Sequence, residues 1–183
     1  MAQSTVKAKM VDHRGRRLSH VAPDGSVRMV DVGGKPVTQR RALAQAIVRL
    51  KPQALKAIRQ RAAKKGDVLL TAQIAGIAAA KITSQLIPLS HPLPLTHVDV
   101  RCQPRGTDTI HIECAASCSG RTGVEMEAMT GAAVAALTVY DMCKALDREI
   151  VIEKLQLMEK SGGKSGRFRR AEKATLPGDK KRP

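Results

Sequence analysis

The sequence predicts an α+β domain in which helices pack on one face of an antiparallel sheet. Two runs, residues 97–102 and 109–118, alternate between apolar and polar side chains as strands do, and a turn signal at 104–108 separates them. Helical stretches precede and follow this hairpin, and the second is followed by one more strand-like run. With 183 residues the chain suits one domain.

The first part of the chain is polar and uneven, and we expect residues 1–18 to form a disordered basic tail. Residues 26–32 alternate weakly, which predicts a short strand or an extended arm that ends at the Gly33–Gly34 pair. Thr38 can cap a helix, and the apolar residues after it roughly keep helical spacing. We therefore predict a helix from Thr38 to about residue 63, which Pro52 could interrupt.

Two further helices are predicted over residues 68–85 and about 125–146, and a last strand over 150–158. The first of these helices is apolar on nearly every side, which is typical of a helix buried on most sides. It carries a face of small residues that would let another helix come close: Ala72, Gly76, Ala79 and Thr83.

The formal net charge of +16 lies mostly at the two ends of the chain. Residues 1–41 contain 9 basic and 3 acidic residues, and residues 164–183 contain 8 basic and 2 acidic ones. One Tyr, one Phe and no Trp leave no stacking platform for single-stranded nucleic acid, so we expect no specific nucleic-acid partner. No apolar run is long enough to cross a membrane, and four Cys without a C-x-x-C pair are typical of free thiols in the cytoplasm.

The run from Lys160 to Gly166 combines two lysines, two serines and three glycines in seven residues. These residue types hold phosphate oxygens, because glycine lets backbone N–H groups approach and lysine adds charge. The spacing differs from a Walker A loop. On the residues alone, a flexible linker explains the run equally well.

Several ionisable residues lie in apolar surroundings. His91 stands between prolines, where it could present its imidazole or simply bond to backbone. Glu125 and Glu127 suit the start of a helix, and either carboxyl group could also be half-buried with a raised pKa. Asp141 and Lys144 are three residues apart on a helix, which fits a surface ion pair or a shielded pair for proton transfer.

Five strings in one order resemble the molybdenum cofactor biosynthesis protein C family, the cyclic pyranopterin monophosphate synthases. They cover residues 65–68, 87–93, 122–128, 137–145 and 160–166. The resemblance spans about residues 19–168, which we take as the domain, and leaves 169–183 as a second basic tail expected to be disordered.

The resemblance implies a ferredoxin-like fold and a hexamer, a trimer of dimers, with active sites between subunits. It implies a lyase that converts 3′,8-cyclo-7,8-dihydroguanosine 5′-triphosphate to cyclic pyranopterin monophosphate and releases pyrophosphate. Asp141, Lys144 and Lys65 match the family's catalytic residues. The positions that match its substrate-contacting residues are Leu89, Ser90, His91, Met126, Glu127, Glu125, Arg40 and Lys160.

One departure from the family pattern is visible, since Ser90 stands where a cysteine is common. The reaction has no redox step, so we expect no required cofactor, with Mg²⁺ at most accompanying the substrate phosphates. A basic RNA-associated protein that binds through its tails is the rival class, and the scarcity of aromatic residues disfavours it. The Ala-rich, buried-looking helices favour dimers or higher oligomers.

Overall fold

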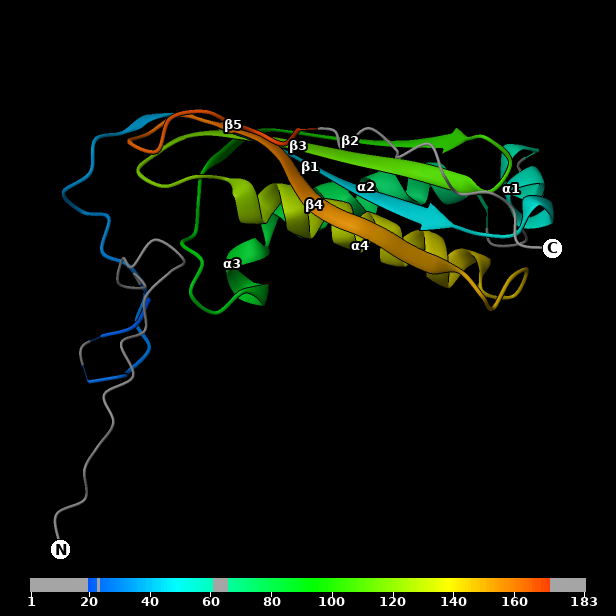
Figure 1. Ribbon diagram of the computed structural model, residues 1–183, viewed down its shortest axis with the longest axis horizontal. Helices are drawn as coiled ribbons and strands as arrows, with labels where there is room; N and C mark the ends of the chain where they lie inside the picture. The colour runs from blue at the N-terminus through cyan, green and yellow to red at the C-terminus, as the bar shows by residue number, and fades with distance from the viewer. Residues whose placement is uncertain (1–19, 23, 61–65, 172–183) are drawn as a thin grey trace, which may run out of the picture.

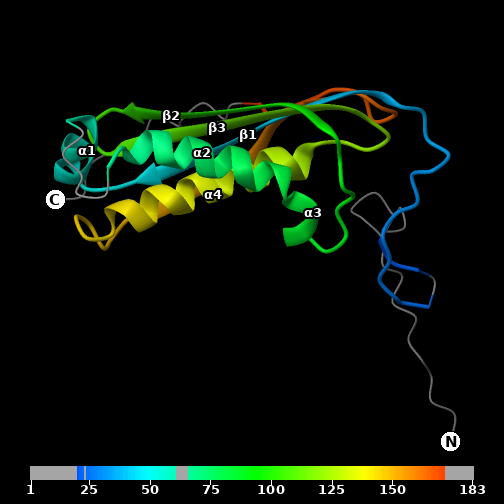
Figure 2. The same cartoon turned by 180° about the vertical axis from the view of Figure 1, so that it is seen from behind.

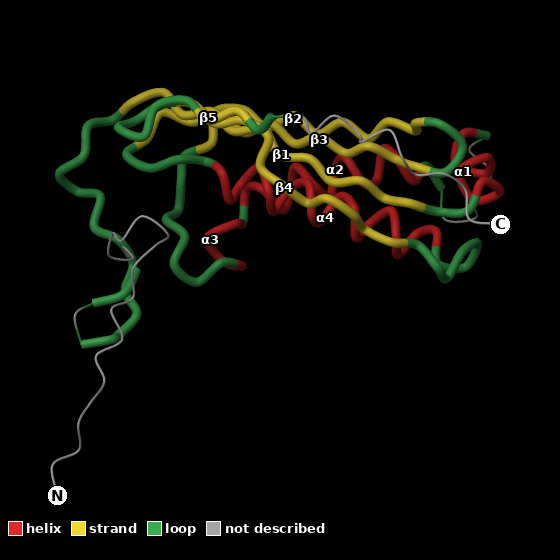
Figure 3. The backbone as a smooth tube through the Cα atoms, viewed as in Figure 1, coloured by secondary structure: helices red, strands yellow, loops and turns green. Residues whose placement is uncertain are grey.

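Five strands form one antiparallel sheet in the order β2-β3-β1-β4-β5 (Figure 1). They are β1 (Thr38–Arg49), β2 (Leu95–Arg105), β3 (Thr109–Gly120), β4 (Val151–Ser161) and β5 (Phe168–Arg169). The computed structural model describes residues 20–22, 24–60 and 66–171. Figure 3 shows the strands gathered in one layer with the helices beneath them.

The helices lie on one face of this sheet (Figure 2). They are α1 (Pro52–Arg59), α2 (Val68–Lys81), the short α3 (Thr83–Leu86) and α4 (Glu125–Cys143). The chain crosses from β1 to β2 through the first three helices and from β3 to β4 through α4, and each crossover skips one strand. This arrangement confirms the predicted α+β class and is ferredoxin-like.

The predicted helix from Thr38 to residue 63 is wrong, because this segment is strand β1 followed by the short helix α1. β1 is central, between β3 and β4, and every second side chain from residue 40 to 48 is buried: Arg40, Ala42, Ala44, Ala46 and Val48. Ile47, between the last two, is buried as well. Alanine and leucine favour helix locally, and pairing on both sides outweighs that preference. Pro52 begins α1 rather than interrupting a helix, since its missing N–H has no intrahelical partner there.

The core is built from small side chains, and α2 crosses α4 at a glycine pair. A Cβ added to Gly76 would lie 2.8 Å from the Gly131 carbonyl oxygen, and one added to Gly131 would lie 2.5 Å from Cys114 Sγ. All four residues of the predicted small-residue face are buried. Close helix packing therefore confirms that prediction.

Residues 26–32 form no regular strand, apart from one bridge between Val21 and Val27, so the extended arm is the correct alternative. At the other end, the backbone N–H of Arg170 donates to the Met158 carbonyl at 2.8 Å, so the first residues of the expected C-terminal tail lie along β4. Lys65, residues 1–19 and residues 172–183 lie outside the described residues. Within the described part of the chain, none of the helices is long and apolar enough to span a membrane.

Candidate functional site

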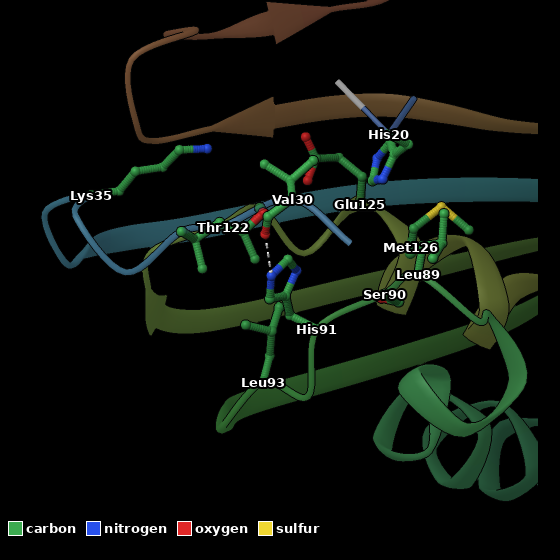
Figure 4. A pocket seen from close by; sticks show the side chains of 12 residues that line it. His20, Val30, Lys35, Leu89, Ser90, His91, Leu93, Thr122, Glu125 and Met126 are labelled. Atoms are coloured by element: carbon green, nitrogen blue, oxygen red, sulfur yellow. Dashed lines mark hydrogen bonds between the residues drawn. The ribbon is translucent and has the colours of Figure 1, made fainter. Parts of the chain in front are cut away.

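A pocket of about 360 Å³ opens where the segment before β1 passes the loop before β2 and the start of α4 (Figure 4). Five of the sequence-predicted substrate residues line it: Leu89, Ser90, His91, Glu125 and Met126. They come from two segments more than thirty residues apart, and the fold brings these segments to the same end of the sheet.

His91 is oriented by the backbone of the N-terminal segment. Its Nε2 lies 2.8 Å from the Val30 carbonyl oxygen, as Figure 4 shows. A carbonyl oxygen can only accept, so Nε2 carries the proton of this bond. In the neutral ring Nδ1 then holds the lone pair and can accept a proton. Both alternatives weighed for His91 hold, since it bonds to backbone and also lines the pocket.

Glu125 and Lys160 form an ion pair beside the pocket. Lys160 Nζ donates to Glu125 Oε1 at 2.9 Å and to Ser165 Oγ at 3.3 Å. The Glu125 side chain folds back over Gly123, where an added Cβ would lie 1.8 Å from Oε2. Glycine at 123 therefore makes room for the carboxylate to meet the lysine.

Glu127 follows the pocket residue Met126 in α4, and only 3% of the residue is exposed. Burial raises the pKa of its carboxyl group, and the negative charge of Glu125 adds to that shift. Cys118 is close enough for the Glu127 charge to help raise the thiol pKa, although burial of the thiol is the larger cause. Of the two carboxyl groups considered for a raised pKa, Glu127 is the one whose pKa is raised, and it is almost fully buried rather than half-buried.

Arg40 holds two loops together under the same end of the sheet. The residue is 9% exposed, and its Nε and Nη2 donate to the Gly120 and Arg121 carbonyls at 3.2 and 3.3 Å. The glycines of the 160–166 run close over its guanidinium: a Cβ on Gly163 would lie 1.7 Å from Nη1. The run is therefore a tight turn around an arginine rather than a free linker.

Asp141 and Lys144 lie away from this pocket in the single chain. Lys144 Nζ contacts Asp141 Oδ1 at 2.8 Å, and their side chains are 54% and 60% exposed. The hydrogen bond from Lys144 to Asp141 raises the lysine pKa. Sixteen residues of helix separate Asp141 from Glu125, a rise of about 24 Å. In a single chain, the C-terminal end of α4 therefore carries an exposed ion pair.

The third predicted catalytic residue, Lys65, lies outside the described residues. The chain becomes described again just before α2, where the Asp67 side chain accepts from the Leu70 N–H at 3.0 Å and caps the helix. α2 runs antiparallel to α4, so α2 begins at the end of the molecule where α4 ends (Figure 2). Among the described candidate residues, Glu125 and Met126 lie at the start of α4, and Asp141 and Lys144 lie at its end.

No sequence pattern placed the N-terminal segment at the site, yet its residues His20, Val30, Val32 and Lys35 line the pocket. The basic residue directly after the Gly33–Gly34 turn was the one usable signal. Over the described ranges, no group of three or more His, Cys, Asp or Glu side chains could hold a metal ion.

The MoaC family model matches residues 29–163, most of the chain. Cyclic pyranopterin monophosphate synthase 1 of Mycobacterium bovis is 53% identical over 162 residues, covering 88% of this chain and 95% of the relative. Synthase 3 of Mycobacterium tuberculosis is 51% identical over 170 residues, covering 93% and 96%. The human molybdenum cofactor biosynthesis protein 1 is 52% identical over 85% of this chain, which spans 24% of that longer protein. This chain belongs to the MoaC family.

Proposed function

We propose that this chain performs the reaction for which its mycobacterial relatives are named, as a cyclic pyranopterin monophosphate synthase. It is a lyase of an early step in molybdenum cofactor biosynthesis. Its substrate is 3′,8-cyclo-7,8-dihydroguanosine 5′-triphosphate, and its products are cyclic pyranopterin monophosphate and pyrophosphate. The observation that carries the proposal is the pocket, which collects five of the substrate residues implied by the family.

The charges around the pocket suit that chemistry. A leaving pyrophosphate develops negative charge, and Lys160 lies beside the pocket in position to offset it. Ring opening and rebuilding need groups that hold and move protons. His91 with a free Nδ1 and Glu127 with a raised carboxyl pKa are such groups in this half of the site. Since the steps are proton transfers and phosphoryl chemistry without net oxidation, no redox cofactor is required.

The complete site forms between two copies of the chain. Asp141 and Lys144 are solvent-exposed in one copy and lie about 24 Å along α4 from Glu125. A two-fold axis that places two α4 helices antiparallel brings the Asp141 end of one to the Glu125 end of the other. The outward face of the helical layer is apolar enough for such contact, with Leu70, Ile74 and Leu137 all more than half exposed. Three such dimers make the hexamer, and four buried cysteines that form no disulfide suit a reducing cytoplasm.

The proposed function is tested by incubating the protein with the cyclised dihydro-GTP substrate and measuring pyrophosphate and the pterin product. Asp141→Asn and Lys144→Ala should lower kcat by about a hundredfold or more, the usual effect of losing an acid–base group. Asp99→Asn is the matched control, because Asp99 forms an equally short, exposed ion pair with Arg101 at 2.8 Å. Full turnover in the Asp141 and Lys144 variants would overturn their roles, and no product from the wild type would overturn the function.

A further inference from the structure

A buried carboxylate lies at the end of the molecule away from the pocket. Among the described residues, the buried charged ones are Arg40 and Glu127, near the pocket, and Asp147, which follows α4 and is 3% exposed. Asp147 Oδ2 accepts from the Lys51 N–H at 2.7 Å, and Oδ1 accepts from the Glu149 N–H at 2.9 Å. The Lys51 N–H is the largest cause that lowers the pKa of this carboxyl group, which is therefore charged at neutral pH.

These two hydrogen bonds attach the turn after α4 to a rigid part of the sheet. Lys51 directly precedes α1 and is 96 positions from Asp147 in the sequence. Arg49, two residues earlier, pairs with β3 on one side and with β4 on the other. Figure 2 shows α1 and the last turn of α4 at the same end of the molecule. The Asp147 carboxylate therefore joins the corner between β1 and α1 to the chain that leaves α4.

The backbone that carries Lys144 is held between α4 and this carboxylate. Lys144 caps the C-terminal end of α4, and its N–H donates to the Tyr140 carbonyl at 2.8 Å. The N–H groups of Leu146 and Asp147 both donate to the carbonyl of buried Cys143, at 2.8 and 3.1 Å. Only two residues separate Lys144 from Asp147, so the Asp147 side chain fixes the turn from which the Lys144 side chain extends.

The exposed pair of Asp141 and Lys144 needs support from the backbone. Their side chains are 60% and 54% exposed, so little packing around them fixes the 2.8 Å contact between Nζ and Oδ1. A displacement of about 1 Å at a reacting group can lower a rate a hundredfold. Buried charged contacts can often be replaced by apolar ones without loss of stability, so stability alone does not explain a charged anchor here.

We propose that Asp147 is a positioning residue, whose carboxylate fixes the turn after α4 and thereby the place of the Lys144 ammonium beside Asp141. This assignment rests on the proposed function for the reaction that Asp141 and Lys144 serve. Asp147 acts through the backbone of the turn. Its loss should therefore slow the chemical step and spare substrate binding at the pocket, since Lys160 and Glu125 lie at the opposite end of α4.

The first experiment measures steady-state kinetics and inorganic pyrophosphate binding for Asp147→Asn. Asparagine has the same shape, and its NH₂ group would face one of the two backbone N–H donors. We expect kcat to fall about tenfold or more, while KM and the pyrophosphate Kd stay within about twofold. The assays are run at a temperature at which circular dichroism shows the variant to be folded, so that lost stability does not enter.

Asp108→Asn is the matched control for this experiment. The Asp108 carboxylate contacts the Arg49 side chain at 2.6 Å near the same corner, and its carbonyl accepts from the Leu50 N–H. This control should keep the wild-type kcat. An unchanged kcat in folded Asp147→Asn would overturn the proposal. Equal losses of kcat and of affinity would also overturn it, because they would indicate general disorder.

The second experiment is a double-mutant cycle of Asp147→Asn with Lys144→Ala. If Asp147 acts through Lys144, the double variant has the same kcat as Lys144→Ala alone. Additive losses of kcat would show that Asp147 acts on the reaction by another route, and would overturn the positioning claim.

A third measurement needs no turnover and separates this proposal from the proposed function. Hydrogen exchange of the Lys144 and Leu146 amides should be about tenfold faster in Asp147→Asn, because the turn loses its anchor. Exchange at Ala136, in the buried middle of α4, should stay as in the wild type. Unchanged exchange at Lys144 and Leu146 would overturn the anchor even if the enzyme is active. A wild type that forms no product would overturn the proposed function and leave the exchange result standing.

Discussion

Glu127 is an ionisable carboxyl group that the protein keeps almost completely out of water. It is 3% exposed, and its pKa is raised first by burial and then by the charge of Glu125. Burial of a charged carboxylate lowers stability, and proteins accept such costs mainly at functional sites. At the residue scale, Glu127 is therefore the group whose environment departs most clearly from what stability alone would favour.

The raised pKa of Glu127 predicts a pH-dependent stability difference. Its contribution to stability is fully present below the unfolded pKa, near 4.5, and is lost as pH rises through the folded value. We expect Glu127→Gln to gain stability over the wild type as pH rises from 4.5 to 8, measured by urea unfolding. Glu113→Gln, on the exposed side of β3, should show no such trend. A Glu127→Gln difference that stays flat with pH would contradict this explanation.

The close approach of Gly163 to the Arg40 guanidinium leads to a second prediction at the residue scale. Its φ is +72°, and an added Cβ would lie 1.7 Å from Arg40 Nη1. Gly163→Ala should displace Arg40 from the carbonyls it bonds and lower the free energy of unfolding by about 1–3 kcal/mol in chemical denaturation. Gly166→Ala separates backbone strain from the steric clash with Arg40. Gly166 has a similar φ of +66° but open space around its Cβ position, so its substitution by alanine causes the strain without the clash. Equal losses in both variants would assign the effect to backbone strain alone.

At the scale of elements, the sequence predicted the helices and strands whose local pattern agrees with their final environment. The hairpin β2–β3 was found from its alternating pattern, and helices α2 and α4 were found as long apolar helical stretches, each within a few residues. β1 was mistaken for a helix because its buried positions hold alanine, a strong helix former, and only pairing with β3 and β4 shows the period of two. Central strands of small residues lack the β-branched signal on which strand prediction depends.

The contact between α2 and α4 predicts that Gly131→Ala is destabilising although alanine favours helix. The new Cβ would lie 2.5 Å from Cys114 Sγ and 3.1 Å from the Gly76 carbonyl oxygen. Overpacking of this kind costs about 1–3 kcal/mol, more than the helix-propensity gain of about 1 kcal/mol for replacing glycine. Thermal and urea unfolding measure the change. Gly34→Ala, with open space at its Cβ position, should be nearly neutral, and a Gly131→Ala protein at least as stable as wild type would refute the close contact.

For the site, the sequence motifs found residues that share a local string, such as Ser90 with His91 and Glu125 with Met126. They could not show that Arg40 is engaged with two carbonyls, nor that the N-terminal segment returns to the pocket. The Arg40 contacts and the Arg121 contact with the N-terminal segment join residues 80 or more positions apart. The N-terminal segment itself alternates only weakly, so its pattern does not show where it lies. The sequence was enough to predict which side chains could do chemistry. Their positions relative to one another could be known only from the fold.

At the scale of the whole molecule, the outward face of the helical layer predicts an oligomer. Ile74 and Leu137 are 60% and 57% exposed there. Light scattering at micromolar concentration should show a hexamer for the wild type. Ile74→Glu with Leu137→Glu should give smaller species, because charges are excluded from the core of such an interface. Gln103→Glu on the edge strand β2 is the control, and a monomeric wild type would contradict the proposed assembly.

The central claim is that each active site takes one half from each of two copies of the chain. Co-expression of His91→Ala with Asp141→Asn tests it most directly, because each variant damages a different half. Each variant alone should be inactive with the cyclised dihydro-GTP substrate. A random equal mixture leaves about one site in four with both halves intact, so we predict about a quarter of wild-type pyrophosphate release. A mixed assembly as inactive as its parents would show that a single copy supplies the whole site, and would contradict the account.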